Sequence, residues 1–481
     1  MSRVEDQGRS ATAGREIRFG TSGWRGRLGD EVTFARARRL ARGLGIHWRG
    51  RGELRRVLIG FDTRLASEAL ACCVSDVLSE SGFEPILSRE ALPTPALTHA
   101  VRRRRVAGGV MLTASHNPPL DHGVKVFGPS GGALAEEEVR QIEATLKRCD
   151  DRESPKAARV RRIDLIEPYV RQMRPLLEKQ GFETGHVRVI YDAMHGAGAN
   201  LLPRLLDSFG VEVDLLNADL DPGFGGRAPD PVPAHLSDLI GRVEKGKTAY
   251  DLGLATDGDS DRLTVVLRSG RVLSETEMAA LLVDYLAETG RLRGGIAVTQ
   301  ATGCLIGHVA RGRGLELIQT PIGFKFLAPL MDSKRAAAAA DESGGFAWSR
   351  MGIDKDGLLA AALFCEIASV TPQGVEHRLQ ALEAAYGPSH CGRGSVPQTG
   401  AAESAFRRLH SAPPDRFDGL KVVEVDGQDG LRLTLEDGFV MWRGSGTEPV
   451  FRVYAEATTK QRLGRRLRLA ERLLGDHPTS R

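Results

Sequence analysis

A serine stands between alanine and histidine in the segment TASHNPPLDHGVK, Thr113–Lys125. The segment follows the apolar run Gly109–Leu112, and its two prolines prevent a helix from starting there. A hydroxyl held on a rigid loop at the end of a strand suits a nucleophile, which makes Ser115 a candidate for covalent catalysis. A turn stabilised by the serine side chain, next to an asparagine that caps a helix, explains the same residues equally well. We call Thr113–Asp121 the serine loop.

Three aspartates alternate with small residues in Asp257–Arg262, DGDSDR, directly after the apolar run DLGLAT. Their carboxylates can converge only if the chain curls, which Gly258 and Ser260 permit. Three hard oxygen donors suit Mg²⁺, and a cation beside a nucleophilic serine would stabilise charge on a phosphoryl group. The segment is not an EF-hand, because Arg268 occupies the twelfth position. An acidic surface turn neutralised by Arg262 is the alternative. We call Asp257–Arg262 the metal loop.

A short polar loop, Asp341–Gly345 (DESGG), follows the small-residue run Ala336–Ala340. Its carboxylate and hydroxyl groups, on a backbone made flexible by glycine, could form hydrogen bonds with neighbouring hydroxyls of a sugar. A plain polar turn explains these residues equally well. We call Asp341–Gly345 the sugar loop.

A glycine-rich segment near the C-terminus, Arg443–Pro449 (RGSGTEP), combines backbone N–H groups, two hydroxyls and the planar fork of Arg443. Backbone N–H groups that converge in a turn bind phosphate, and a guanidinium adds a bidentate contact. The segment lacks the GK[ST] ending of a Walker A motif. An ordinary loop is the alternative. We call Arg443–Pro449 the phosphate loop, and Arg452 lies just beyond it.

Short apolar strands followed by a loop and a helical stretch recur along the chain and would position these loops. The repeats lie more than 100 residues apart, which favours three similar α/β domains over one large sheet. The rest resembles a smaller α+β domain, so we expect an α/β protein with four domains around a central cleft. The expected strands and helices are Arg56–Gly60 with Ala66–Ser81, Val187–Tyr191 with Asn200–Phe209 and Val211–Leu216, Gly295–Thr299 with a helix to about Arg311 and Leu315–Gln319, and the strands Lys421–Val425 and Leu431–Leu435.

Breaks in composition suggest where the domains begin and end. The charged run Cys149–Ala158 and the Pro/Gly/Ser-rich run Tyr386–Ala401 are the clearest linkers, and the second is the expected hinge of the last domain. The predicted division is a flexible tail at 1–15 and domains at 16–155, 156–268, 269–385 and 386–481, which carry the serine, metal, sugar and phosphate loops in that order.

The composition excludes several classes of protein. Hydrophobic residues make up 41% and charged residues 27%, which excludes a largely disordered or coiled-coil chain. A net charge of +4 is too small to indicate nucleic-acid binding but suits an anionic small substrate. The C-terminal helix carries many arginines among leucines, and we expect those arginines on a solvated outer face. Six cysteines form no CxxC pair, so reduced thiols and a cytoplasmic location are expected.

The N-terminal residues lack an apolar core, so they do not resemble a signal peptide, and no run is long enough for a membrane helix. We therefore expect no membrane and no nucleic acid among the partners, and the sequence gives no prediction of an oligomeric state.

Together these loops resemble the α-D-phosphohexomutase family, which includes the phosphoglucomutases and phosphomannomutases. The resemblance runs from about Ile17 to Arg481, and the four loops occur in the family's order. Three further motifs match the family: GTSGWRG at Gly20–Gly26, YDAMHG at Tyr191–Gly196 and TPIGFK at Thr320–Lys325.

The resemblance implies roles for individual residues. Ser115 would carry the phosphoryl group, with His116 beside it, and Lys125, Arg25 and Arg262 would line the transfer site. The metal ligands implied for Mg²⁺ are Asp257, Asp259, Asp261 and the phosphoserine oxygen of Ser115. The substrate-binding residues implied are Gly323, Lys325, Asp341, Ser343, Arg443, Ser445, Gly446, Thr447 and Arg452.

The activity implied is interconversion of hexose 1-phosphate and hexose 6-phosphate, with glucose 1,6-bisphosphate as intermediate and activator. The ESGG form of the sugar loop resembles members that act on glucose phosphates, and phosphomannomutase is the alternative. A Mg²⁺-dependent phosphomonoesterase and a sugar-phosphate-binding relative without turnover are the rival classes.

Three positions depart from the family pattern. Asp341 stands where Glu is usual, Gly444 where Pro is usual and Ser260 where Gly or Ala is common. The first two bear on substrate preference and affinity more than on the chemistry.

Overall fold

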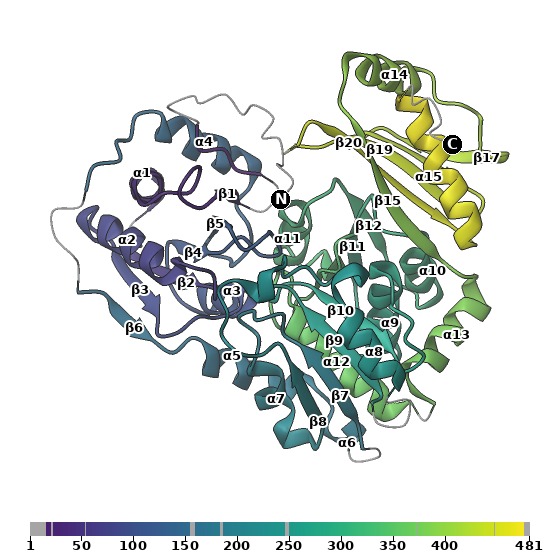
Figure 1. The fold of residues 1–481 in the computed structure, drawn as a ribbon, viewed down its shortest axis with the longest axis horizontal. Coiled ribbons are helices and arrows are strands. Elements are labelled where there is room, and N and C mark those ends of the chain that lie inside the picture. Colours follow the sequence, from purple (N-terminus) through teal and green to yellow (C-terminus); the bar gives the residue numbers. More distant parts are fainter. Residues whose placement is uncertain are drawn as a thin grey trace, which may run out of the picture.

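A computed structural model describes residues 16–20, 23–52, 54–153, 159–182, 186–245, 250–371, 373–446 and 448–475. These residues form four separate sheets, each flanked by helices (Figure 1). Three sheets contain parallel strands and the fourth is wholly antiparallel, as predicted for three α/β domains and a smaller α+β domain. The α/β class is therefore confirmed.

The first sheet has six strands in the order β1-β5-β4-β2-β3-β6. Strands β4, β2, β3 and β6 are parallel, and β5 and β1 add an antiparallel edge. Because β2 and β4 are parallel neighbours, the loops that follow them lie at the same edge of the sheet. The sheet extends to Ile163, past the boundary expected at residue 155. Its elements are β1 (Trp24–Arg27), α1 (Phe34–Arg49), β2 (Arg56–Phe61), α2 (Ser67–Glu80), β3 (Glu84–Ser88), α3 (Thr94–Arg103), β4 (Gly108–Leu112), β5 (Asp121–Phe127), α4 (Glu136–Leu146) and β6 (Arg161–Ile163).

The second and third sheets have four strands each, in the orders β10-β9-β7-β8 and β12-β11-β13-β14. Each has three parallel strands and one antiparallel edge strand. The domain built on the second sheet contains α5 (Ile166–Met173), α6 (Lys179–Phe182), β7 (Arg188–Asp192), α7 (Leu201–Leu206), β8 (Glu212–Leu216), α8 (Ser237–Lys245), β9 (Leu252–Thr256) and β10 (Leu263–Leu267). The domain built on the third sheet contains α9 (Glu275–Glu288), β11 (Gly295–Thr299), α10 (Cys304–Gly312), β12 (Leu317–Thr320), α11 (Phe324–Asp332), β13 (Ala336–Ala340), β14 (Phe346–Trp348), α12 (Gly357–Val370) and α13 (Gly374–Tyr386).

The fourth sheet lies at the upper right of Figure 1 and has the order β15-β20-β19-β18-β17-β16. Its first strand lies within the Pro/Gly/Ser-rich run expected to be a linker, and it pairs with β20 over its whole length. The run is therefore structured beyond His390, and the connection itself is short. The elements are β15 (His390–Pro397), α14 (Gly400–Ser411), β16 (Arg416–Phe417), β17 (Leu420–Asp426), β18 (Leu431–Leu435), β19 (Gly438–Gly444), β20 (Val450–Ala457) and α15 (Lys460–Leu474).

The C-terminal helix α15 differs from expectation at one arginine. Arg466 was expected on a solvated face, but its side chain is fully buried. Its guanidinium donates to Asp437 Oδ1 at 2.6 Å and to the carbonyl oxygen of Glu456, and it lies 3.5 Å from Asp418. The prediction was wrong because an acidic pair distant in sequence neutralises this charge inside the domain.

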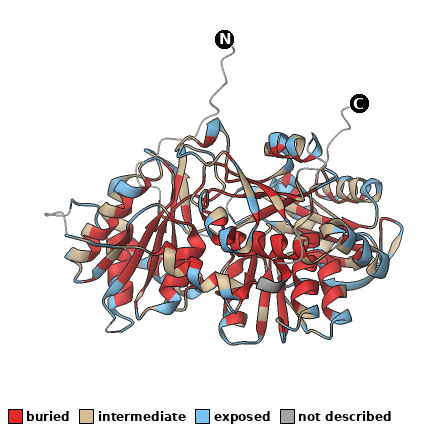
Figure 2. Cartoon of the chain, turned by 90° about the horizontal axis from the view of Figure 1, so that it is seen from below, coloured by how far each residue is buried: buried red, intermediate tan, exposed pale blue. Residues whose placement is uncertain are grey.

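Helix α12 lies at the centre of the molecule and packs against the second sheet as well as its own domain. It is buried along almost its whole length, and Figure 2 shows buried strands enclosed by helices with exposed outer faces. One apolar cluster includes Leu97 of α3, Leu254 of β9 and Leu363 of α12, so the first three domains share a core. Among the described helices none alone is long and apolar enough to cross a membrane, although the bent pair α12 and α13 meets that test by length and composition.

Asp356 fixes the start of α12. Its Oδ1 accepts hydrogen bonds from the N–H of Leu359 at 2.9 Å and from the hydroxyl of Tyr169 at 2.7 Å. Tyr169 belongs to α5 and is buried, so this carboxylate both caps α12 and holds α5 against it.

We expect Asp356→Ala to lower the free energy of unfolding by about 2–4 kcal/mol, because it removes a helix cap and leaves a buried hydroxyl without an acceptor. Asp356→Asn keeps an acceptor oxygen and is the matched control. Thermal unfolding of both variants tests this. Equal midpoints for the alanine and asparagine variants would show that the two hydrogen bonds do not stabilise the protein.

Candidate active site

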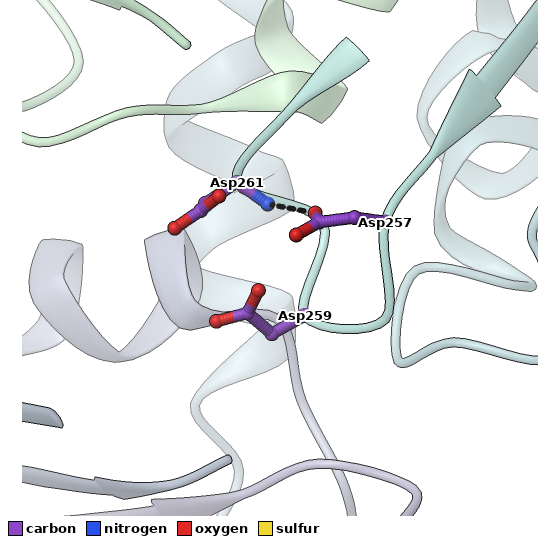
Figure 3. A group of neighbouring side chains, drawn as sticks. All are labelled: Asp257, Asp259 and Asp261. Carbon is purple, nitrogen blue, oxygen red and sulfur yellow. Dashed lines mark hydrogen bonds between the residues drawn. The ribbon is translucent and has the colours of Figure 1, made fainter. Parts of the chain in front are cut away.

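The metal loop is a tight curl after β9. Ser260 adopts a left-handed backbone conformation with φ of 57°, which reverses the chain between the second and third aspartates. Asp257 Oδ1 accepts a hydrogen bond from the N–H of Asp261 at 3.0 Å (Figure 3). It also accepts one from the N–H of Arg262 at 3.2 Å. The first aspartate of the loop thus closes it, and the three carboxylates are brought together as the sequence predicted.

The three carboxylates fit a divalent cation. One oxygen from each lies within 4.8 Å of the others, and all three side chains are buried. Asp259 Oδ1 and Asp261 Oδ1 are buried and accept no hydrogen bond from the residues that the structure describes. Buried polar atoms are almost always satisfied, so these oxygens indicate a missing positive partner, and hard oxygen donors suit Mg²⁺. Asp257, Asp259, Asp261 and the oxygen of Ser115 would hold the ion.

The charges around the metal loop are strongly coupled. Burial, together with the nearby Asp261 and Asp259, raises the pKa of Asp257 to about 8. Burial acts the same way on Asp259, but Lys125 outweighs it and holds the pKa of that carboxyl below its usual range. Lys125 Nζ donates to Asp259 Oδ2 and to Asp261 Oδ2, both at 2.6 Å. Asp257 is thus the carboxyl whose ionised form is disfavoured unless further positive charge lies beside the loop.

Ser115 lies against the metal loop although it is 142 residues away in sequence. Its Oγ donates a hydrogen bond to Asp257 Oδ2 at 2.7 Å, and its N–H donates to Thr113 Oγ1 at 2.8 Å. The backbone of Ser115 is left-handed, with φ of 54°, which is uncommon for a residue with a side chain. One hydrogen bond thus joins the candidate nucleophile to the candidate cation site.

The other residues predicted at this centre come from neighbouring elements. Arg25 of β1 donates to Asn117 Oδ1 at 2.8 Å, and Arg262 lies 3.9 Å from both Asp230 and Asp261. Burial, with Arg262 nearby, lowers the pKa of His116 to about 4, so its imidazole is neutral at pH 7. His116 Nδ1 lies 3.4 Å from Asp230 Oδ2.

The sugar loop is held by its own aspartate. Asp341 Oδ1 accepts hydrogen bonds from the N–H of Ser343, the hydroxyl of Ser343 and the N–H of Gly345, at 3.0, 2.7 and 3.0 Å. Its Oδ2 lies 3.7 Å from Lys355 Nζ, which also lies 3.6 Å from Asp261. Lys355 therefore joins the sugar loop to the metal loop. The adjacent Glu342 accepts a hydrogen bond from Thr299 Oγ1 at 2.6 Å.

Lys325 and Gly323 lie at the start of α11. Gly323 caps the helix with φ of 124°, a conformation that favours glycine, and Lys325 Nζ lies 2.6 Å from Glu136 of the first domain. Lys325, Lys355 and Lys125 line a cavity of about 290 Å³ between the first and third domains.

The phosphate loop forms a separate group where β19 ends, and this end of the fourth sheet faces the first domain (Figure 1). Arg443 Nε donates to Asp429 Oδ1 at 2.8 Å, and Arg452 donates to Glu448 at 2.6 Å. The hydroxyl of Ser445 accepts a hydrogen bond from the N–H of Glu448 at 3.3 Å, and Gly446 follows it. Thr447 lies outside the described residues.

The connection between β17 and β18 ties the phosphate loop to the third domain. Asp429 Oδ2 accepts a hydrogen bond from the N–H of Ile322 at 2.7 Å, and Asp426 accepts one from Gln300. One carboxylate therefore contacts both Arg443 and the loop before α11.

The sequence analysis did not identify Arg64, Asp230, Lys355 and Asp429 as site residues. Arg64 follows β2 at the edge of the first sheet that carries the serine loop, and that position is the signal that could have identified it.

Family models for phosphoglucomutase/phosphomannomutase match the chain in order: alpha/beta/alpha domain I at 16–153, domain II at 167–270, domain III at 274–386 and the C-terminal domain at 398–472. The chain belongs to the phosphoglucomutase/phosphomannomutase family. The family predicted from the loops is thus confirmed, and the chain is an enzyme of the phosphotransferase-isomerase type.

Individual members of the phosphoglucomutase/phosphomannomutase family are similar over nearly the whole chain. A phosphoglucomutase/phosphomannomutase of Thermococcus kodakarensis is 28% identical over 95% of this chain and 98% of its own. A Methanothermobacter thermautotrophicus protein assigned as a phosphoglucosamine mutase is 31% identical over 92% and 94%. The crystal structure of a Thermus thermophilus protein assigned as a phosphomannomutase is 30% identical, covers 95% of this chain and 99% of its own, and has a TM-score of 0.84.

We expect Asp259→Asn to weaken Mg²⁺ binding at least about tenfold, because an uncharged amide replaces one of three charged oxygen donors. Calorimetric titration with Mg²⁺ measures this directly. Asp192→Asn, a buried carboxylate at the end of β7 in the same domain, is the matched control and should bind Mg²⁺ as the parent does. Equal affinities for the two variants would remove Asp259 from the metal site.

Proposed function

We propose that this enzyme interconverts hexose 1-phosphate and hexose 6-phosphate through a phosphoserine at Ser115 and a hexose 1,6-bisphosphate. The observation that carries the proposal is the hydrogen bond from Ser115 Oγ to Asp257, which joins the serine loop to the metal loop. A phosphomonoesterase would not need the sugar and phosphate loops, which are both present.

In the first half-reaction the phosphoryl group leaves Ser115 Oγ for the free hydroxyl of a hexose monophosphate. The bond from phosphorus to Oγ breaks, a bond to the sugar oxygen forms, and the hydroxyl proton passes to a nearby base. His116 is proposed as that base, because Asp230 faces its Nδ1 and leaves Nε2 as the acceptor. Bound Mg²⁺ would neutralise charge on the transferring group. Lys125 and Arg25 supply further positive charge, which phosphoryl transfer requires.

The second half-reaction needs the bisphosphate to turn over, so that its other phosphate returns to Ser115. The proposed phosphate loop binds whichever phosphate is not reacting, through Arg443, Ser445, Gly446, Thr447 and Arg452. Arg443 uses Nε for Asp429, and its terminal nitrogens suit a bidentate contact with phosphate. Gly323, Lys325 and the sugar loop are proposed to contact the rest of the substrate, with Asp341 ordering the loop that presents Ser343 and Glu342.

Glucose phosphates are the proposed substrates, with glucose 1,6-bisphosphate as activator. The support is the ESGG form of the sugar loop, which resembles that of family members acting on glucose phosphates. Mannose phosphates are the second candidate, because relatives of this chain carry phosphomannomutase names.

A mutase assay on glucose 1-phosphate, mannose 1-phosphate and glucosamine 1-phosphate, each with catalytic bisphosphate, tests the proposal. We expect isomerisation without release of free phosphate, fastest on glucose 1-phosphate. Net phosphate release would indicate a phosphomonoesterase, and no turnover on any sugar would indicate a binding relative. Faster turnover on mannose or glucosamine 1-phosphate would show that the proposed reaction is right and the proposed substrate wrong.

We expect Ser115→Ala to abolish mutase turnover and leave the fold intact, because a loop hydroxyl contributes little to stability. Ser130→Ala, in another loop of the same domain, is the control and should keep full activity. Mass spectrometry after incubation with the bisphosphate should find the phosphoryl group on the parent and the control but not on Ser115→Ala. Turnover of Ser115→Ala within about tenfold of the parent contradicts the assignment.

We expect Arg443→Lys to lower kcat/KM roughly ten- to a hundredfold, because a point charge replaces a planar fork at a bidentate site. The value of kcat should fall as well, since binding of the remote phosphate also orients the reacting hydroxyl. Arg407→Lys, on the exposed face of α14, is the control. Steady-state kinetics on the preferred sugar phosphate measure both, and an unchanged kcat/KM would assign the phosphate loop another role.

A further inference from the structure

The serine loop has a backbone that needs external support. Ser115 is left-handed, a backbone conformation that is unfavourable for residues other than glycine. Within the loop, backbone bonds run only from Asn117 to Ala114 and from Asp121 to Pro118 among the described residues. Pro118 and Pro119 have no N–H, so their peptide groups cannot donate to a neighbouring strand.

A single guanidinium binds the carbonyl groups of this loop. Arg64 Nη2 donates to the carbonyl oxygens of Ser115 at 2.6 Å and Asn117 at 2.7 Å. Its Nη1 donates to those of Pro118 at 2.8 Å and Asp121 at 3.0 Å. One side chain therefore binds four carbonyl oxygens of the loop, and that of Pro118 also accepts from the N–H of Asp121.

The side chain of Arg64 is itself held in place by buried contacts. Its side chain is fully buried, its Nε lies 3.3 Å from Asp62 Oδ2, and it stacks over the ring of Phe224 at 4.8 Å. Asp62 in turn accepts from Ser67 Oγ at 2.5 Å, and Ser67 Oγ lies 2.8 Å from His122 Nε2. His122 Nδ1 accepts from the N–H of Gly123, so Nε2 carries the proton and donates to Ser67. Buried hydrogen bonds thus link β5 to Asp62, and an ion pair links Asp62 to the side chain of Arg64.

We propose that Arg64 is a positioning residue that sets the backbone of the serine loop, and with it Ser115 Oγ, against the metal loop; this rests on the function proposed above. Because the peptide bond is trans, a Ser115 carbonyl turned toward Arg64 directs the N–H of His116 the opposite way. Arg64 therefore fixes both the nucleophile and the orientation of the peptide group that follows it. It acts through the loop, and lysine cannot replace it, because an ammonium lacks the fork that four separate carbonyls require.

The test uses Arg64→Lys and Arg64→Ala in the full-length chain, with Arg55→Ala as the matched control. Arg55 is exposed and stacks over Phe83 of the same domain, as Arg64 stacks over Phe224. We expect both Arg64 variants to lose about a hundredfold or more in kcat, because displacing a reacting group by about 1 Å has that effect. KM for the sugar phosphate should change by less than about threefold, since the phosphate loop is untouched.

Rescue separates positioning from stability. Millimolar guanidinium ions should restore part of the turnover of Arg64→Ala and have no effect on Ser115→Ala or the Arg55 control. Thermal unfolding and phosphoserine content are measured in parallel. Rescued turnover at an unchanged midpoint supports positioning, whereas turnover that follows the fraction folded overturns it.

Ser67→Ala decides the question if the Arg64 variants do not fold, because it removes only the hydroxyl that holds Asp62. We expect a several-fold lower kcat at unchanged KM for Ser67→Ala, and a kcat equal to the parent's overturns the proposal. If Ser115→Ala is inactive while Arg64→Lys folds and turns over within about threefold of the parent, only this inference fails. If Ser115→Ala is active, the proposed function fails instead.

Discussion

The carboxylates of Asp257, Asp259 and Asp261 lie together, enclosed by protein, and their like charges repel. Such a group is stable only if positive charge surrounds it, because burial removes the water that would otherwise screen it. Lys125 comes from the first domain, Arg262 from the metal loop and Lys355 from the third domain. Positive charge from the first and third domains thus balances this loop, and its three carboxylates fit a divalent cation.

This constraint also explains the position of the nucleophile. A serine hydroxyl that donates to Asp257 shares the charge of the same loop, so any phosphoryl group on it would lie beside the cation site. The serine loop reaches this position in a backbone conformation that it does not favour alone, and buried contacts to Arg64 compensate for it. The chemistry therefore depends on two loops, each of which needs the other parts of the molecule to hold its shape.

Much of the fold could be predicted from the sequence, and the reasons are local. Strands such as Gly295–Thr299 are short apolar runs preceded by glycine, and their pattern does not depend on partners elsewhere. The metal loop was predictable for the same reason, since its three donors lie within five residues.

Contacts between distant residues were not predictable. Arg64 binds backbone carbonyl groups more than 50 residues away. Every residue has a carbonyl group, so the sequence does not show which ones Arg64 binds. Arg466 has the spacing of a surface residue, and only the folded domain brings Asp437 beside it. The sugar loop differs, because Asp341 accepts three hydrogen bonds from its own loop, and residue types alone do not show which way a carboxylate in a short polar loop turns.

Asp429 couples the fourth domain to the third. The domain has its own apolar core, which would suggest a module that relatives could exchange freely. Yet the arginine of its phosphate loop and the peptide group of Ile322 in the third domain share this one carboxylate. A substitution that moves either of these loops should therefore move the other as well. Chimeras between members of the family should keep the third and fourth domains from the same parent.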